Sequence, residues 1–195
     1  MWNERYADTE YAYGREPNDF LRNNASALKP GSVLCIAEGE GRNAVFLAGL
    51  GFEVTAMDAS SVGLEKARRL AAENGVSINT VTADMQEFDF GEDAFDNIIS
   101  VFAHVPPPVR KAVHRQLQVS LTPGGVFLLE AYTPAQLEYK TGGPPVAEMM
   151  MDLATLKQEL IGLEMRQGRE VVRDIHEGVY HDGPGAVVQV LAVNS

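Results

Sequence analysis

The chain has little positive charge, and it has no long apolar run. Its 195 residues carry 16 lysines and arginines against 27 aspartates and glutamates, a formal net charge of −11. Because phosphate attraction dominates binding to DNA and RNA, this balance argues against nucleic acids and anionic membranes as partners. No stretch approaches the roughly 20 apolar residues that span a bilayer. The first residues, Met1 to Tyr6, lack the basic and apolar regions of a signal peptide, so we expect a cytoplasmic protein.

Cysteine and histidine are also scarce. The single cysteine, Cys35, cannot form an intramolecular disulfide, and the four histidines have no metal-ligand spacing, so we expect no metal site. With 45% apolar residues, a chain of this length can bury a core without disulfides or metal. We therefore expect one domain over residues 1–195, as a monomer or homodimer.

What the chain does contain is an apolar run that breaks at alternating glycines. Residues 32–37 predict a strand, Gly39 and Gly41 predict a tight turn, and residues 42–50 predict a helix. Glycine allows the turn and lets a ligand approach the backbone closely. The pattern indicates a nucleotide-type pocket.

Charge in the turn narrows the choice of ligand. Gly39-x-Gly41-x-x-Ala44 also satisfies the dinucleotide fingerprint, so a nicotinamide-dependent oxidoreductase is an alternative. Glu38 and Glu40, however, place carboxylates where a pyrophosphate would be repelled. A ligand with an ammonium and a sulfonium, such as S-adenosyl-L-methionine, suits that charge.

The segment Gly39-Glu-Gly-Arg-Asn-Ala-Val-Phe-Leu-Ala48 resembles the first motif of class I S-adenosylmethionine-dependent methyltransferases, and it is most similar to the tellurite-resistance (TehB-like) branch. The resemblance implies a Rossmann-like α/β fold. Its doubly wound, mostly parallel sheet would have seven strands in the order 3-2-1-4-5-7-6, with the last strand antiparallel.

The pattern of the rest of the chain agrees with that fold class. We expect strands over residues 32–37, 53–57, 77–83, 97–101 and 126–131, with helices over 17–28, 42–50 and 61–74 and another opened by Pro106 and Pro107. A helix over 153–160 precedes strands over 169–180 and 186–193, whose short link predicts antiparallel pairing. Residues 1–28 would form a lid and helix, 32–131 the cofactor-binding core, and 132–195 the acceptor side.

Function in such a sheet lies at the carboxyl ends of the strands. Asp58, with Ala59 beside it, is placed to accept hydrogen bonds from ribose hydroxyls. The resemblance implies that Asp84 accepts from the adenine amino group while Met85 packs on the ring. The remaining expected cofactor contacts are Asn43, Val101 and Phe102. Asp58 and Asp84 are equally typical of residues that cap the next turn.

Tyr11-Ala-Tyr-Gly-Arg-Glu-Pro17 resembles the segment that TehB-like enzymes fold over the cofactor. That resemblance implies that Arg15 pairs with the cofactor carboxylate and that Tyr11 or Tyr13 closes over the reactive methyl. The alternative is that this aromatic cluster, with Trp2 and Tyr6, fastens the terminus to the core.

Methyl transfer needs alignment, exclusion of water and, for some acceptors, a base. His104, His176 and His181 are candidate bases, and His181 matches a TehB histidine near the acceptor. Asp182 stands where that branch has arginine, a change that weakens the case for an oxyanion acceptor. We expect a small-molecule methyl acceptor, a chalcogen oxyanion or a thiol. The remaining alternative is a non-catalytic S-adenosylmethionine-binding module.

Overall fold

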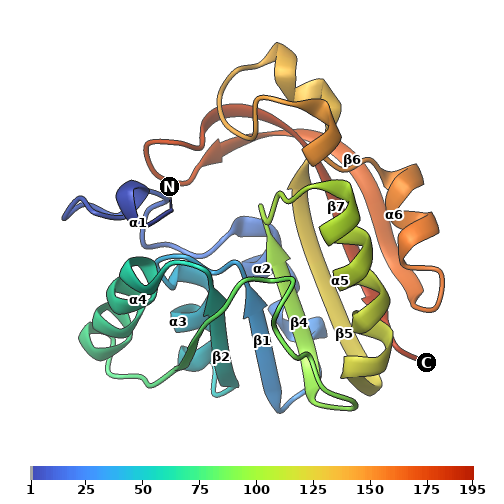
Figure 1. The fold of residues 1–195 in the computed structure, drawn as a ribbon, viewed down its shortest axis with the longest axis horizontal. Coiled ribbons are helices and arrows are strands. Elements are labelled where there is room, and N and C mark those ends of the chain that lie inside the picture. Colours follow the sequence, from blue (N-terminus) through green and yellow to red (C-terminus); the bar gives the residue numbers. More distant parts are fainter. Residues whose placement is uncertain (1) are drawn as a thin grey trace.

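The computed structural model describes residues 2–195 and contains a seven-stranded sheet in the order β3-β2-β1-β4-β5-β7-β6 (Figure 1). All neighbours pair in parallel except β7, which is antiparallel to both β5 and β6. The predicted strand order and the antiparallel ending are therefore confirmed. The strands are β1 Ser32–Ile36, β2 Glu53–Asp58, β3 Asn79–Thr82, β4 Phe95–Val101, β5 Leu121–Tyr132, β6 Glu164–His176 and β7 Asp182–Val193.

The helices alternate with the parallel strands as predicted, with differences at their ends. They are α1 Trp2–Arg5, α2 Asp19–Asn24, α3 Arg42–Gly49, α4 Ser61–Glu73, α5 Pro107–Ser120 and α6 Leu153–Glu159, with 3₁₀ turns η1 Ala25–Ala27, η2 Pro134–Glu138 and η3 Ala147–Met149. The first predicted helix is shorter, because the Asn18 side chain accepts from the Leu21 N–H and so caps α2 after Pro17.

Strands β4, β5, β6 and β7 begin earlier than their patterns predicted, and β6 ends at His176 rather than at residue 180. Leu121 already pairs with Phe95, and the register then shifts to pair Asn97 with Val126, so the expected turn before residue 126 is an irregularity inside β5. β6 begins at Glu164 because it follows β7 to the far end of the hairpin, where Glu164 pairs with Val193. The sequence could not predict this extension from an alternation of buried and exposed residues, because most of β6 lies exposed at the edge of the sheet.

Side chains of the central strands alternate between two apolar layers. Leu34 and Ile36 of β1 face a core shared with α5 and α6, whereas Val33 and Cys35 face a core shared with α2, α3 and α4. In Figure 1, α5 crosses in front of the sheet and α3 lies behind it. The buried Cys35 is a free thiol whose pKa burial raises, in keeping with a packing role.

The strand register brings the carboxyl ends of the parallel strands to one edge. Ile36 lies level with both Met57 and Ser100, and Val101 lies level with Glu130. This edge is uppermost in Figure 1, where the N-terminal segment and the β6–β7 hairpin lie above it. Among residues 2–195, no helix combines the length and the apolar character needed to cross a bilayer.

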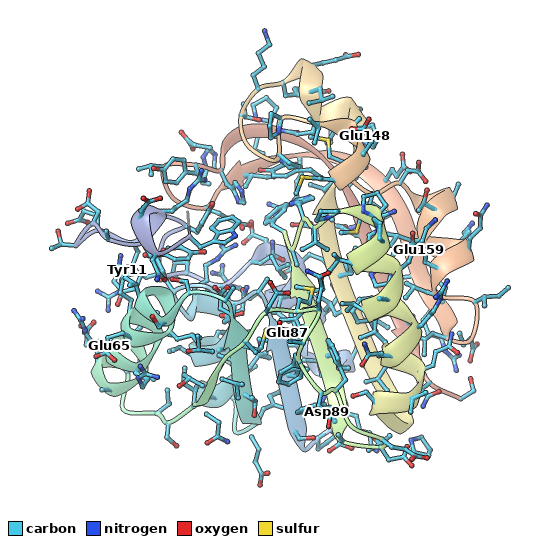
Figure 2. The ribbon with its side chains drawn as sticks, viewed as in Figure 1. Tyr11, Glu65, Glu87, Asp89, Glu148 and Glu159 are labelled. Carbon is cyan, nitrogen blue, oxygen red and sulfur yellow. The ribbon has the colours of Figure 1, made fainter. Side chains whose placement is uncertain are left out.

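A buried ion pair joins α5 to α6. The Arg110 guanidinium contacts Glu159 with N–O distances of 2.9–3.2 Å, and His114 Nδ1 lies 2.7 Å from Glu159 Oε2. Burial opposes ionisation of Glu159, but its hydrogen bonds to His114 and Arg110 outweigh this and lower its pKa to about 2. Figure 2 shows Glu159 between the two helices and Glu65 on the outer side of α4.

We predict that Glu159→Gln lowers the free energy of unfolding by about 3 kcal/mol at pH 7, because the buried Arg110 charge loses its partner. Since the folded pKa lies below the ordinary value of 4.5, the stabilisation is complete above that value and is lost as pH falls toward 2. Urea titrations between pH 7 and pH 3 measure both effects. Glu65→Gln, which removes an exposed ion pair on α4, is the control and should change stability far less. Equal losses in the two variants would contradict this account.

Close packing of α3 on α4 depends on Gly41. This residue has φ +90°, and a Cβ on it would lie 2.5 Å from the Ala67 Cβ and 2.7 Å from the Ala67 Cα. Gly51 has φ +93°, but a Cβ there would meet nothing within 4 Å. Substitutions at the two glycines therefore distinguish the cost of a positive φ from the cost of disturbing the packing of α3 on α4.

We predict that Gly51→Ala costs about 1 kcal/mol of unfolding free energy, from its positive φ alone. Gly41→Ala should cost more than about 3 kcal/mol, because the added methyl group also collides with the α4 backbone. Urea denaturation of the two variants measures the difference. Similar costs would mean that α4 shifts freely and that the contact with Ala67 is unimportant.

Candidate functional site

The glycine turn after β1 is held from within by Glu38. Its Oε1 accepts from the backbone N–H groups of Asn43 at 2.9 Å and Ala44 at 2.8 Å, the first turn of α3. Burial raises the pKa of Glu38 to about 7, although these bonds favour the ionised form. The Glu38 carboxylate thus caps the N-terminus of α3, which Gly41 has no side chain to do. These backbone N–H groups provide part of the pairing for Glu38 that the sequence analysis assigned to a ligand.

Asp58, at the end of β2, ties that strand to the same turn. Its Oδ2 accepts from the Gly39 N–H at 2.9 Å, and its Oδ1 accepts from the Ser60 N–H at 2.7 Å. Burial raises the pKa of Asp58, opposed by these two bonds. A carboxylate has about four acceptor positions, so this engagement leaves capacity for ligand hydroxyls. Ala59, also a predicted contact, lies exposed beside it.

Glu40 is not free for a ligand in the way the sequence predicted. It is buried, its Oε1 lies 2.5 Å from Lys66 Nζ, and its Oε2 accepts from the Tyr13 N–H at 3.3 Å. Lys66 also donates to the carbonyls of Asp8 and Glu10. Glu40 and Lys66 therefore anchor the N-terminal segment to α4. Sequence reasoning missed Lys66, whose signal was a lysine between Gly63, Leu64 and Ala67 on the buried face of that helix.

The N-terminal segment lies against the turn, but with different residues from those predicted. The Tyr6 hydroxyl lies 2.6 Å from the point where a Cβ on Gly39 would stand, and Tyr6 is buried. This agrees with the alternative in which the aromatic residues fasten the terminus to the core. Asn43, a predicted cofactor contact, instead accepts from the Asn18 N–H at 2.9 Å.

Arg15 and Tyr11 belong to the N-terminal segment and contact α3 and α4 rather than the strand ends. Arg15 pairs with Glu73 at the end of α4, and its guanidinium lies 5.3 Å from the Tyr11 ring centre. Tyr11 packs against Val45 and Leu70 (Figure 2). In this arrangement neither residue meets the glycine turn, whereas Tyr13 reaches the strand ends.

Asp84 and Met85 differ in exposure. Asp84 is exposed, and its Oδ1 accepts from the Gln86 N–H at 2.8 Å, which is the capping role that the sequence left open. Met85 is buried and joins Ile36 and Ser100 around a small cavity of about 10 Å³ that extends toward α5. Met85 therefore lies beside the ends of β1 and β4, as predicted.

Two non-glycine residues adopt left-handed backbone conformations directly after the central strands. Ala37 follows β1 with φ 50°, and Phe102 follows β4, where Val101 is buried, with φ 53°. Such strain concentrates at functional sites, and these strands flank the point where the strand order reverses. The sequence carries no signal for these conformations.

His104 is engaged by backbone on both sides of its ring. Its Nδ1 lies 3.0 Å from the Phe102 carbonyl, and its Nε2 accepts from the Tyr132 N–H at 3.0 Å. Burial lowers its pKa to about 4. Neither nitrogen is left to take a proton from a substrate, so the structure disfavours His104 as a base. Exposed His176 pairs with Asp182 at 2.7 Å, and this contact raises its pKa.

His181 lies in an aromatic cluster that we call the aromatic box: Tyr13, Phe102, Tyr132 and His181. The His181 ring centre lies 4.7 Å from that of Tyr13, 4.6 Å from Phe102 and 5.3 Å from Tyr132. Burial, and then the Arg42 charge, lower the pKa of His181 to about 3. Sequence reasoning missed Tyr132, at the end of β5. In the part of the chain that the structure describes, no three histidine, cysteine or acidic side chains gather to hold a metal ion.

A buried network of charges borders the aromatic box. Arg42 contacts Glu177 at 2.5 Å, and Arg173 contacts both Glu177, at 2.8 Å, and Glu130. The Asn18 side chain donates to Glu130 and Glu177 as well. The network joins the N-terminal segment, α3, β5 and the β6 end, and it buries the Arg42 charge at the start of α3.

Residues 33–125 match a family model described as a methyltransferase domain. An uncharacterised methyltransferase, YbaJ, of Bacillus subtilis is 34% identical over 96 residues, 47% of this chain and 38% of that protein. The 2-heptyl-1-hydroxyquinolin-4(1H)-one methyltransferase of Mycobacteroides abscessus is 28% identical, covering 71% of this chain and 63% of that protein. The chain thus spans well under two thirds of the length of several curated relatives.

Among solved structures, TehB of Haemophilus influenzae has a TM-score of 0.75 at 18% identity, covering 100% of this chain and 66% of that chain. This likeness is one of fold. The matched segment runs from β1 to the start of β5 and contains the glycine turn, Asp58 and Asp84. Residues 33–125, just under half of the chain, thus match the methyltransferase-domain family, and the strand order together with the likeness to TehB gives the chain the fold of class I methyltransferases.

Proposed function

We propose that this protein transfers a methyl group from S-adenosyl-L-methionine to a small-molecule acceptor. The observation that carries the proposal is the row of carboxylates, Glu38, Asp58 and Asp84, that follow β1, β2 and β3 at one edge of the sheet. The cations near the turn's own carboxylates have partners: Lys66 is paired with Glu40, and Arg42, whose charge also acts on Glu38, is paired with Glu177. A turn of this charge suits a cationic ligand better than the pyrophosphate of a nicotinamide cofactor.

The chain's donor and acceptor groups fit the proposed cofactor. Asp58 has remaining acceptor positions for ribose hydroxyls, and Glu38 has a second carboxylate oxygen near the turn for a positive charge. Asp84 is exposed with one oxygen unused by its turn, and Met85 offers an apolar surface. When bound, the cofactor supplies an electrophilic methyl group on a sulfonium. The protein's part is to orient the acceptor and exclude water.

The acceptor side supports a compact substrate. The N-terminal segment, the loop after β5 and the β6–β7 hairpin enclose the aromatic box, in which Tyr132 and His181 are buried. The relative from Mycobacteroides abscessus, named for a hydroxyquinolinone, also favours a small molecule. We include thiols and chalcogen oxyanions, the acceptors expected from the sequence, among the substrates to be tested.

Isothermal titration calorimetry with S-adenosylmethionine and S-adenosylhomocysteine tests the cofactor. We expect saturable binding of both, weakened about tenfold in Asp84→Ala by the loss of one hydrogen bond to the adenine amino group. Asp89→Ala is the matched control, because Asp89 is likewise exposed and accepts from the Gly91 N–H two residues on. Its affinity should equal that of the wild type.

Absence of binding by the wild-type protein would overturn the proposed function. Equal weakening in the two aspartate variants would assign the effect to the loop's fold instead. Binding without methylation of any acceptor would favour a non-catalytic cofactor-binding module.

Binding should also release protons near neutral pH. Burial holds the pKa of Glu38 at about 7, so at pH 6.5 much of this group is protonated, and a cationic ligand beside it favours the ionised form. Calorimetry at pH 6.5 in buffers of different ionisation enthalpy measures this release. Glu38→Gln keeps an oxygen for the Asn43 and Ala44 N–H groups but cannot titrate, so its proton release should vanish. Undiminished release in that variant would exclude Glu38 as the source.

A further inference from the structure

Two buried polar atoms in the aromatic box have no hydrogen-bond partner within residues 2–195: the Tyr132 hydroxyl and His181 Nδ1. Tyr132 is fully buried, and His181 is 7% exposed. A buried polar group without a partner costs about 1–3 kcal/mol, so a pair in one cluster calls for an explanation. A ligand group that bonds to both is the simplest one.

The two side chains come from neighbouring places on the acceptor side. Tyr132 ends β5, and His181 immediately precedes β7, the strand that pairs with β5. A Cβ built on Gly142 would lie 2.7 Å from the Tyr132 hydroxyl and 2.9 Å from His181 Cδ2. The hydroxyl and the Cδ2 edge of the imidazole ring therefore approach the same point, under the loop after β5, with Nδ1 on the other side of Cγ in the same ring.

Loop residues, rather than the sheet, cover this pair. The glycines of the loop after β5, Gly142 and Gly143, lie directly on the Tyr132 ring, and Tyr13 of the N-terminal segment packs on His181. A compact molecule would therefore reach the pair from the side of these loops. Phe102, in its left-handed conformation after β4, packs its ring against those of both Tyr132 and His181.

The buried charges that face the pair are compensated, since Arg42 and Arg173 are neutralised by Glu130 and Glu177. Arg5, whose charge also acts on His181, is exposed and donates to the Tyr13 hydroxyl at 3.1 Å. His181 is neutral at pH 7, because burial lowers its pKa to about 3. An oxyanion therefore meets no unpaired buried cation among the described residues, whereas a neutral hydroxyl or thiol can donate to Nδ1 and accept from the tyrosine.

We propose that the Tyr132 hydroxyl and His181 Nδ1 together hold the nucleophilic atom of the methyl acceptor, and that this acceptor is a neutral alcohol, phenol, hydroxylamine or thiol on an apolar body. The inference rests on the proposed function and names its substrate class. A lone pair of the acceptor's oxygen or sulfur forms the bond to the methyl carbon, and the electrons of the breaking carbon–sulfur bond remain on the sulfonium sulfur. The acceptor's proton leaves to water, and His181 orients it by accepting a hydrogen bond.

The test is methyl-transfer kinetics, read as S-adenosylhomocysteine formation, with phenylmethanethiol, benzyl alcohol and 1-hydroxyquinolin-4(1H)-one against selenite and tellurite. The wild type should methylate at least one neutral acceptor and neither oxyanion. Tyr132→Phe removes only a hydroxyl that has no partner in the fold, so melting temperature and cofactor affinity should stay unchanged or improve while kcat/KM falls roughly tenfold.

Tyr139→Phe is the matched control, because it makes the same chemical change at a half-exposed position outside the aromatic box. His181→Phe keeps a ring in the cluster and should lower kcat/KM comparably. Because the two groups hold one atom, the double variant should be about as slow as the slower single variant rather than showing the product of the two losses.

Full activity in Tyr132→Phe, or a melting temperature several degrees lower, would overturn the proposal, since the second result would reveal a structural partner. Turnover of selenite or tellurite, or failure of every neutral acceptor in a protein that binds the cofactor, would overturn the substrate class. Failure to bind the cofactor at all would instead overturn the proposed function.

Discussion

Two carboxylates that bind backbone amides hold the site together. Asp58 accepts from Gly39 at the end of the neighbouring strand, and Glu38 accepts from the first amides of α3. These bonds fix a turn that has few side chains of its own to hold it. They also concentrate negative charge at the strand ends, so the interactions that build the turn set the charge of the ligand it suits.

The acceptor side depends on a different principle, the pairing of buried charges. Arg42 and Arg173 are each matched to a glutamate, and Asn18 bonds to both glutamates. Breaking such a pair is costly because the remaining charge stays buried. The network therefore holds the N-terminal segment and the β6 end beside β5 while contributing no net charge to the aromatic box. The aromatic box therefore adjoins a charge-balanced network, whereas carboxylates hold the glycine turn.

Much of the fold was predictable because its signals are local. Apolar runs and glycines marked the strands and the turn, and the short link between the last two strands required antiparallel pairing, as observed. The position of Asp58 at the end of β2 follows from the strand pattern, since parallel strands bring their carboxyl ends to one edge; the roles of Asp58 and Met85 in binding stay predictions. Glu40, Arg15 and Tyr11 lie elsewhere than expected, because their partners, Lys66 and Glu73, are distant in sequence.

The sequence by itself determined the class of fold, the position of the glycine turn and the acidic character of the donor side, because each follows from residues adjacent in the chain. Only the tertiary structure decided which side chains remain free to bind. Both nitrogens of His104 are engaged by backbone, whereas Tyr132 and His181 bury polar atoms that nothing in the described chain satisfies. The bond from Tyr132 to His104 spans 28 residues, and strand register and loop packing create such contacts, which local sequence does not encode.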